Sequence, residues 1–268
     1  MRTVSAIKNI NSTLIVYGFN MVLQFIIRFV LLYYLSIEYL GLNGLFDNIL
    51  TVLSLTELGI GPAIIFSLYA PLANHDLETA KSIMRIFKKA YIYIGTLILF
   101  LGLCISPFVQ YLIKVPPNIA YLNIFFLLFV VDTGISYFYS YKKCLLIADQ
   151  KQYIANYYRG ITQLIGSLFQ IALVILTHSF WVYIILRICM TFSENFLIAR
   201  KADHLYSFLN EKNIQPLNKD IYQNIIRNIK ALILHKIGGV TVFGTSNIIL
   251  SKFVGLSAVA LYTNYSLR

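Results

Sequence analysis

Residues 13–35 read TLIVYGFNMVLQFIIRFVLLYYL, an almost unbroken apolar run. An α-helix of about 20 such residues crosses the ~30 Å hydrocarbon core of a bilayer. Tyr33, Tyr34 and Leu35 stand where a signal peptide would carry small residues for cleavage, so we predict a retained spanning helix. Similar apolar runs follow at residues 43–70, 91–113, 119–141, 160–177 and 180–199.

The composition of the chain agrees with these runs. Hydrophobic residues make up 58% of the sequence and charged residues 12%, whereas a soluble domain carries about 25% charged residues. We therefore predict an all-α membrane protein, a helical bundle that begins with six spans. A soluble enzyme is excluded on the same grounds.

The net charge of +11 follows the predicted loops. The intervening loops hold only Lys114 and Lys252. Basic residues gather instead in every second loop, at Arg2, Lys8, Lys81, Arg85, Lys88, Lys89, Lys142, Lys143, Lys151, Arg159, Arg200, Lys201, Lys212, Lys219, Arg227 and Lys230. Cytoplasmic loops carry such an excess of Lys and Arg, so we predict a cytoplasmic N-terminus. The charge then indicates contact with membrane lipids and not with nucleic acid.

The cysteines and histidines predict no cofactor or metal. Cys104, Cys144 and Cys189 are odd in number and lie in or beside the spans, without the spacing of a disulfide framework. The four histidines show no metal-ligand spacing.

A different pattern follows the sixth span. Residues 217–234 read LNKDIYQNIIRNIKALIL, with apolar side chains at helical spacing at Ile221, Ile225, Ile229 and Leu232. This pattern predicts an amphipathic segment on the inner membrane surface. We expect a seventh span at 231–253 and the start of an eighth near Leu256.

The end of the sequence falls inside the expected eighth span. A helix that stopped in hydrocarbon would leave backbone groups unpaired, so we expect a first lobe at 1–230 and the start of a second at 231–268. One lobe alone is then expected not to transport, unless two copies pair. A weak internal repeat agrees with two lobes: YLSIEYLGLNGLFDNIL at 34–50 and FVGLSAVALYTNYSL at 253–267 share a turn and an Asn-bearing aromatic segment.

Polar residues line up along single faces of five predicted spans. An ionised side chain at the bilayer centre costs about 2.5–3.5 kcal/mol, so the shared stripes predict a polar, hydrated interior. The stripes comprise Tyr17, Asn20, Gln24 and Arg28; Asn43, Asp47, Thr51, Ser54 and Glu57; Asp132, Ser136, Tyr139 and Lys143; Gln163, Gly166, Gln170 and Thr177; and Arg187, Thr191 and Glu194.

Two of these charges suit an anionic ligand. The guanidinium groups of Arg28 and Arg187 match phosphate oxygens in bidentate fashion. We predict a substrate-binding cavity formed by Asn20, Gln24, Arg28, Asp47 and Arg187. The alternative is buried ion pairing, Arg28 with Asp47 or Arg187 with Glu194.

A second set of residues suggests coupling or gating. Glu57, Asp132 and Glu194 are expected nearer the middle or inner half of the membrane than the arginines, where they suit cation coupling or act as counter-ions. Gly59, Gly61 and Pro62 permit a bend, which is either a hinge or an ordinary kink.

Two stretches carry a family resemblance. YYLSIEYLGLNGLFDNILTVLSLTELGIGPAIIFSLYAPLANHD at 33–76 and KIGGVTVFGTSNIILSKFVGLSAVALYTNY at 236–265 resemble the polysaccharide transport proteins, or repeat-unit flippases, of the multidrug/oligosaccharidyl-lipid/polysaccharide exporter superfamily. Ser246 departs from the family, which often carries an acidic residue there, and this puts ion coupling at that position in doubt.

The resemblance implies a fold of 12 to 14 spans in two lobes around a central cavity in the bacterial cytoplasmic membrane. It implies transport of undecaprenyl-pyrophosphate-linked oligosaccharides for capsule or O-antigen synthesis. Implied partners are this lipid-linked substrate and the polymerase and glycosyltransferases of the pathway.

Three other functions stay open. A cation-coupled drug antiporter of the same superfamily would favour carboxylates over arginines in its cavity. A flippase for the peptidoglycan lipid precursor shares the pyrophosphate chemistry. A membrane glycosyltransferase or polymerase would need larger outer loops than the predicted connections, whose one acid is Glu38.

Overall fold

The computed structural model describes residues 2–57, 59–114, 119–211, 215–243 and 245–265, without the side chains of 2, 55–56, 210 and 233–243. This part of the chain contains helices and no strand. The α-helices are α1 (Arg2–Tyr34), α2 (Ile37–Leu53), α3 (Ile60–Ala73), α4 (Leu77–Ile105), α5 (Leu122–Ala148), α6 (Gln152–Thr177), α7 (Phe180–Leu205), α8 (Lys219–Phe243), α9 (Ser246–Phe253) and α10 (Leu256–Tyr265). Short 3-10 helices are η1 (Ser54–Glu57), η2 (Ser106–Leu112) and η3 (Ser207–Asn210).

Five helical segments are long and apolar enough to cross a membrane: Thr3–Tyr34, Leu77–Leu112, Leu122–Ala148, Gln152–Thr177 and Phe180–Leu205. They contain or closely overlap five of the six predicted spans. The all-α membrane bundle is therefore confirmed.

The predicted span at 43–70 is not one continuous helix. The chain there forms α2, η1 and α3 in succession. Gly59 adopts φ +76 just before α3, a conformation that glycine reaches without steric cost. Pro62 lies in the first turn of α3, where a missing N–H costs no helical hydrogen bond. The interruption therefore follows from the glycine and proline of this stretch.

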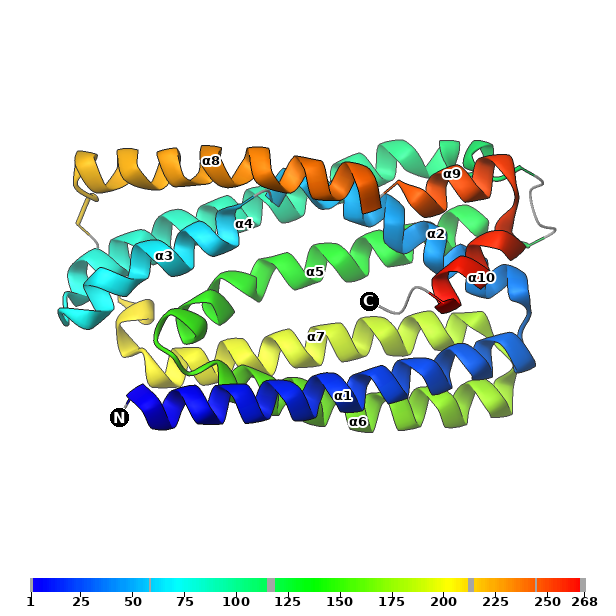
Figure 1. Cartoon of the computed structure of the whole chain (residues 1–268), viewed down its shortest axis with the longest axis horizontal. Coiled ribbons are helices and arrows are strands. Elements are labelled where there is room, and N and C mark those ends of the chain that lie inside the picture. Colours follow the sequence, from blue (N-terminus) through cyan, green and yellow to red (C-terminus); the bar gives the residue numbers. More distant parts are fainter. Residues whose placement is uncertain (1, 58, 115–118, 212–214, 244, 266–268) are drawn as a thin grey trace.

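The amphipathic segment also differs from the prediction. It is continuous with the start of the predicted seventh span in one long helix, α8, rather than a separate surface element. Figure 1 shows α8 running along the bundle, and its residues Ile229 and Leu232 approach the break at Gly59. Ile225 belongs to the hydrophobic core around Phe87 and Tyr91, and Ile221 and Ile229 pack against that core. The side chains of 233–244, within the predicted span, lie outside the described residues.

The helices form two packed groups. Figure 1 shows α1, α6 and α7 on one side, α3, α4 and α8 on the other, and α5 between them. Two hydrophobic cores lie along the bundle, one around Phe46, Phe126 and Phe129 and the other around Phe87 and Tyr91. Outward side chains are also apolar, for example Leu14, Ile15, Phe29 and Tyr33 of α1, Phe169 of α6 and Phe100 of α4. An apolar exterior of this kind fits contact with lipid.

The connections predicted to be basic meet at one end of the bundle. The N-terminus, the α3–α4 and α5–α6 connections and η3 all lie at this end in Figure 1. Asp76 caps α4 here by accepting a hydrogen bond from the Thr79 backbone N–H at 3.0 Å, and this bond lowers the pKa of Asp76. The short α1–α2 and α6–α7 connections lie at the opposite end.

Orientation is tested by labelling single cysteines in a cysteine-free protein. Asn74 and Thr177 are exposed and lie at opposite ends of the bundle. If the basic end faces the cytoplasm, an impermeant thiol reagent labels Thr177→Cys in intact cells. It should reach Asn74→Cys only after permeabilisation. The reverse pattern would show that the N-terminus is outside.

The two segments of the internal repeat pack against each other. A Cβ added at Gly41 of α2 would meet the backbone carbonyl of Leu256, and one at Gly44 would meet the Thr263 hydroxyl. Asn247 reinforces the contact by donating to the Gly44 carbonyl and to Thr263 Oγ1, both at 3.1 Å. Small residues therefore set the close approach of α2 and α10.

Gly41→Ala is expected to lower the thermal stability of the purified protein. The added methyl meets backbone, which cannot rotate away, and such overpacking costs about 1–3 kcal/mol. Gly18→Ala in α1 is the matched control, because nothing lies within 4 Å of its added Cβ. Equal melting temperatures for the two variants in detergent would argue against the close packing of α10.

Candidate functional site

A polar cavity of about 300 Å³ lies between α1, α2, α5, α6 and α7. Its lining combines amides, hydroxyls and four charged groups with a few apolar side chains. The lining residues are Asn20, Leu23, Gln24, Ile27, Arg28, Leu31, Asn43, Asp47, Asp132, Gln163, Ser167, Gln170, Tyr183, Arg187, Met190 and Thr191. Parts of all five predicted polar stripes therefore meet in one space.

All five residues predicted to bind substrate line this cavity: Asn20, Gln24, Arg28, Asp47 and Arg187. Their role in binding stays a prediction. Asn20, Gln24 and Arg28 follow each other at intervals of four residues, so successive turns of α1 present them on one face. Asp132, which we assigned to coupling, joins the same cavity from α5.

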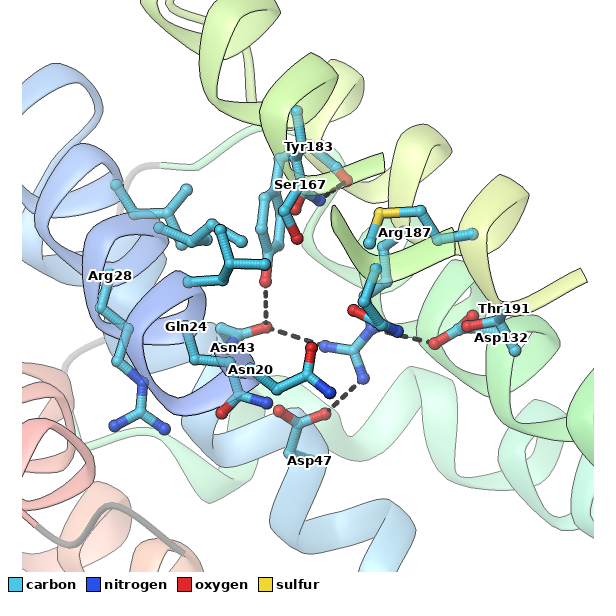
Figure 2. A pocket seen from close by; sticks show the side chains of 16 residues that line it. Asn20, Gln24, Arg28, Asn43, Asp47, Asp132, Ser167, Tyr183, Arg187 and Thr191 are labelled. Atoms are coloured by element: carbon cyan, nitrogen blue, oxygen red, sulfur yellow. Dashed lines mark hydrogen bonds and ion pairs between the residues drawn. The ribbon is translucent and has the colours of Figure 1, made fainter. Parts of the chain in front are cut away.

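Arg187 is the centre of a hydrogen-bond network (Figure 2). Its Nε donates to Asp132 Oδ2 at 2.9 Å, one terminal nitrogen donates to Asn43 Oδ1 at 3.1 Å, and the other donates to Asp47 Oδ1 at 2.8 Å. Tyr183 also donates to Asn43 Oδ1, at 3.2 Å. The guanidinium is thus held by α2 and α5 together.

The network lies partly on apolar surface. The guanidinium carbon of Arg187 sits 4.4 Å from the ring centre of Phe129. The Asp132 side chain is 7% exposed, whereas that of Asp47 is 42% exposed. Asp132 Oδ1 is buried with no hydrogen-bond partner in the described part of the chain. Asp132 therefore depends on Arg187 for its stability far more than Asp47 does.

One of the two alternative ion pairs, Arg187 with Glu194, is wrong. Arg187 pairs with Asp47 and Asp132, and the structure shows no ion pair between it and Glu194 among the described residues. Glu194 instead accepts from Gln163 Nε2 at 3.3 Å. Asp132 and Arg187 meet because α5 and α7 pack side by side, and the expected depth of Asp132 in the membrane stays a prediction.

Arg28 stands apart from this network. Figure 2 shows its guanidinium on the other side of Asn43 and Asp47 from Arg187. It donates to the backbone carbonyl of Thr263 in α10. Asp47 is close enough to attract Arg28 but hydrogen-bonds Arg187. Within the described residues, Arg28 forms no ion pair with a carboxylate, so its positive charge remains open to a ligand.

Apart from Asp132, the residues assigned to coupling or gating lie outside the cavity lining. Glu57, at the end of η1, accepts from Tyr91 Oη at 3.0 Å and from Tyr137 Oη at 2.9 Å. A Cβ at Gly61 would meet Tyr91 Oη at 3.1 Å. The break between α2 and α3 is therefore packed against α4 and α5, and its hinge role stays a prediction.

Three polar or flexible lining residues were not predicted from the sequence: Ser167, Tyr183 and Met190. Ser167 follows Gln163 by one turn of α6, and Tyr183 precedes Arg187 by one turn of α7. Extending the stripe of α7 by one turn would have found Tyr183, and the position four residues after Gln163 would have given Ser167. Met190 could not be found in this way, because its side chain enters only where Gly166 lets α6 and α7 approach.

The described residues contain no group of three or more His, Cys, Asp or Glu side chains placed to hold a metal ion. Comparison of the chain with protein-family models, curated proteins and solved structures finds no match. The cavity and its charged side chains therefore carry the functional proposal.

Proposed function

We propose that this protein is part of a membrane transporter that moves a pyrophosphate-linked oligosaccharide lipid across the bacterial cytoplasmic membrane. The observation that supports this most is that Arg28, in a polar cavity lined by α1, α2, α5, α6 and α7, forms no ion pair with a carboxylate of the described residues. An unpaired cation at this depth is costly unless an anion or water compensates it. Pyrophosphate supplies that anion.

The cavity suits the polar part of such a lipid. Its volume of about 300 Å³ falls at the lower end of the range for small-ligand pockets. It would take the pyrophosphate and the adjoining sugar, while the polyprenyl chain stays among the lipids. The amides of Asn20, Gln24, Gln163 and Gln170 offer both donors and acceptors to sugar hydroxyls.

The resemblance of residues 33–76 to repeat-unit flippases supports the same substrate class. Capsule or O-antigen synthesis would then be the pathway, with a polymerase and glycosyltransferases as functional partners. A lipid-linked peptidoglycan precursor has the same anionic group, so it is the nearest alternative cargo.

One observation favours a second candidate, a cation-coupled drug antiporter. The cavity lining holds two carboxylates, Asp47 and Asp132, as well as the two arginines, and Asp132 Oδ1 lacks a partner in the described part of the chain. A cationic drug would be attracted to these carboxylates. It would also meet two arginines, which makes an anion the better fit.

Binding in lipid nanodiscs separates these functions. The purified protein is titrated with a fluorescent polyprenyl-pyrophosphate disaccharide, with the uncharged polyprenol-linked disaccharide and with ethidium. We expect the pyrophosphate lipid to bind at least about tenfold more tightly than the uncharged one, because charge-assisted hydrogen bonds are lost in the latter. Tighter binding of ethidium would favour the antiporter instead.

A further inference from the structure

A second group of charged side chains lies between the cavity and the basic end of the bundle. It consists of Lys143 from α5, Arg159 from α6, Glu194 from α7 and Tyr17 from α1. The sequence pattern placed Arg159 in a basic loop and counted Lys143 both in that loop and in the polar stripe of the fourth span. Both residues lie inside helices, at least one turn from the nearest helix end. Both side chains are partly buried, and Lys143 lies near Glu194 and Arg159 of neighbouring helices.

The two cations of this cluster are poorly compensated. Lys143 interacts electrostatically with Glu194 and with Arg159. In the described part of the chain, neither cation forms an ion pair or a hydrogen bond, and Arg159 Nε is buried without an acceptor. The guanidinium of Arg159 lies over the ring of Tyr17 at 5.5 Å, a weaker compensation than an anion provides.

Glu194 is the one carboxylate of this cluster, and it also accepts from Gln163 at 3.3 Å. Two cations therefore share one partly engaged carboxylate, and the cluster carries a net positive charge. A group with excess positive charge beside hydrocarbon favours an anionic ligand. Arg supplies a planar pair of donors and Lys a mobile one, which together suit phosphate oxygens.

The cluster is continuous with the cavity. Gln163, which hydrogen-bonds Glu194, is one of the residues that line the cavity. Glu194 follows Arg187 by seven residues in α7, which corresponds to about 10 Å along the helix axis. The cluster is therefore about two helical turns from the cavity, in the direction of the predicted cytoplasmic end.

We propose that Lys143 and Arg159 form a second site, which receives the phosphate groups of the lipid substrate before they reach Arg28. This inference rests on the proposed function, since it assigns an initial binding site to the same substrate. Glu194 competes with the phosphate for the two cations and so keeps binding weak enough for release. The transported headgroup then passes from a cluster of net positive charge to the cavity.

Photo-crosslinking at two positions tests this order. Benzoylphenylalanine replaces Tyr17 to report on the second site, or Ile27, beside Arg28, to report on the cavity. The probe is a radiolabelled polyprenyl-pyrophosphate disaccharide in nanodiscs. In the double variant Lys143→Gln/Arg159→Gln we expect crosslinking at position 17 to fall roughly tenfold or more, because charge-assisted contacts are lost. Crosslinking at position 27 should persist.

Two further variants separate binding from structure. Lys88→Gln/Lys89→Gln removes the same charge from exposed positions of α4 at the same end of the bundle, and it should leave both crosslinks unchanged. Glu194→Gln should increase crosslinking at position 17, because the competing carboxylate is gone. A purely structural role for the cluster predicts a loss or no change for Glu194→Gln, which would overturn the proposal.

The source of the phosphate is tested by competition. Unlabelled polyprenyl-pyrophosphate lipid should suppress the crosslink at position 17, and an equal amount of phosphatidylglycerol should not. Equal suppression would identify a general site for anionic lipids and overturn the proposed initial binding site. Crosslinking at position 27 alone would reject only the second site, whereas crosslinking at neither position would reject the proposed function as well.

Discussion

Arg187→Ala is expected to destabilise the protein more than any other single substitution in the cavity. It removes three hydrogen bonds and leaves the Asp132 carboxylate, 7% exposed, without its cation. Removing one partner of a buried pair costs about 3–5 kcal/mol. We expect little properly folded protein by fluorescence-detected size-exclusion chromatography, and a marked fall in the melting temperature of what remains.

The pairing seen in the structure also predicts a rescue. Arg187→Met combined with Asp132→Asn removes both buried charges, while Asp47, 42% exposed, can be hydrated in the cavity. This double variant should recover most of the lost stability. Arg85→Ala, an exposed arginine of α4, is the control and should melt like the unmodified protein. A stable Arg187→Ala, or a double variant worse than the single one, would contradict the network.

The cavity could be predicted in part from the sequence because it depends on periodicity. Asn20, Gln24 and Arg28 recur once per helical turn, and a polar stripe in an apolar span has to face away from lipid. The helix ends near Tyr34 and Thr177 also followed from the lengths of the apolar runs.

The ion pairs could not be predicted in this way, because they depend on which helices are neighbours. Arg187 and Glu194 share a stripe, but seven residues separate them by about 10 Å along α7, too far for direct contact. Asp132 reaches Arg187 only because α5 packs against α7. Glu57 does not continue the polar stripe of Asn43 and Asp47, because the helix breaks before α3. Its carboxylate instead accepts hydrogen bonds from Tyr91 and Tyr137.

The charge of Arg28 is expected to decide substrate binding without deciding stability. Its described partner is a backbone carbonyl, that of Thr263, and no carboxylate of the described chain is left unpaired when Arg28 is removed. We therefore expect Arg28→Ala to keep a near-normal melting temperature. Its affinity for polyprenyl-pyrophosphate disaccharide should fall roughly tenfold to a hundredfold, as for the loss of a charged hydrogen bond. Arg28→Lys should recover part of the affinity, since an ammonium keeps the charge but loses the bidentate fork.

A second substitution distinguishes binding from buried pairing. If Arg28 served only to neutralise Asp47, the double variant Arg28→Ala/Asp47→Ala would restore what Arg28→Ala loses. The structure predicts the opposite, because Asp47 Oδ1 accepts from Arg187 at 2.8 Å. Removing Asp47 then deprives Arg187 of one counter-ion, but it does not replace the guanidinium that Arg28 offers to the substrate. We expect the double variant to bind the substrate no more tightly than Arg28→Ala. Crosslinking from benzoylphenylalanine at position 27 should therefore stay as low as in Arg28→Ala. Full recovery of that crosslink would show that Arg28 is a structural counter-ion and does not contact the substrate.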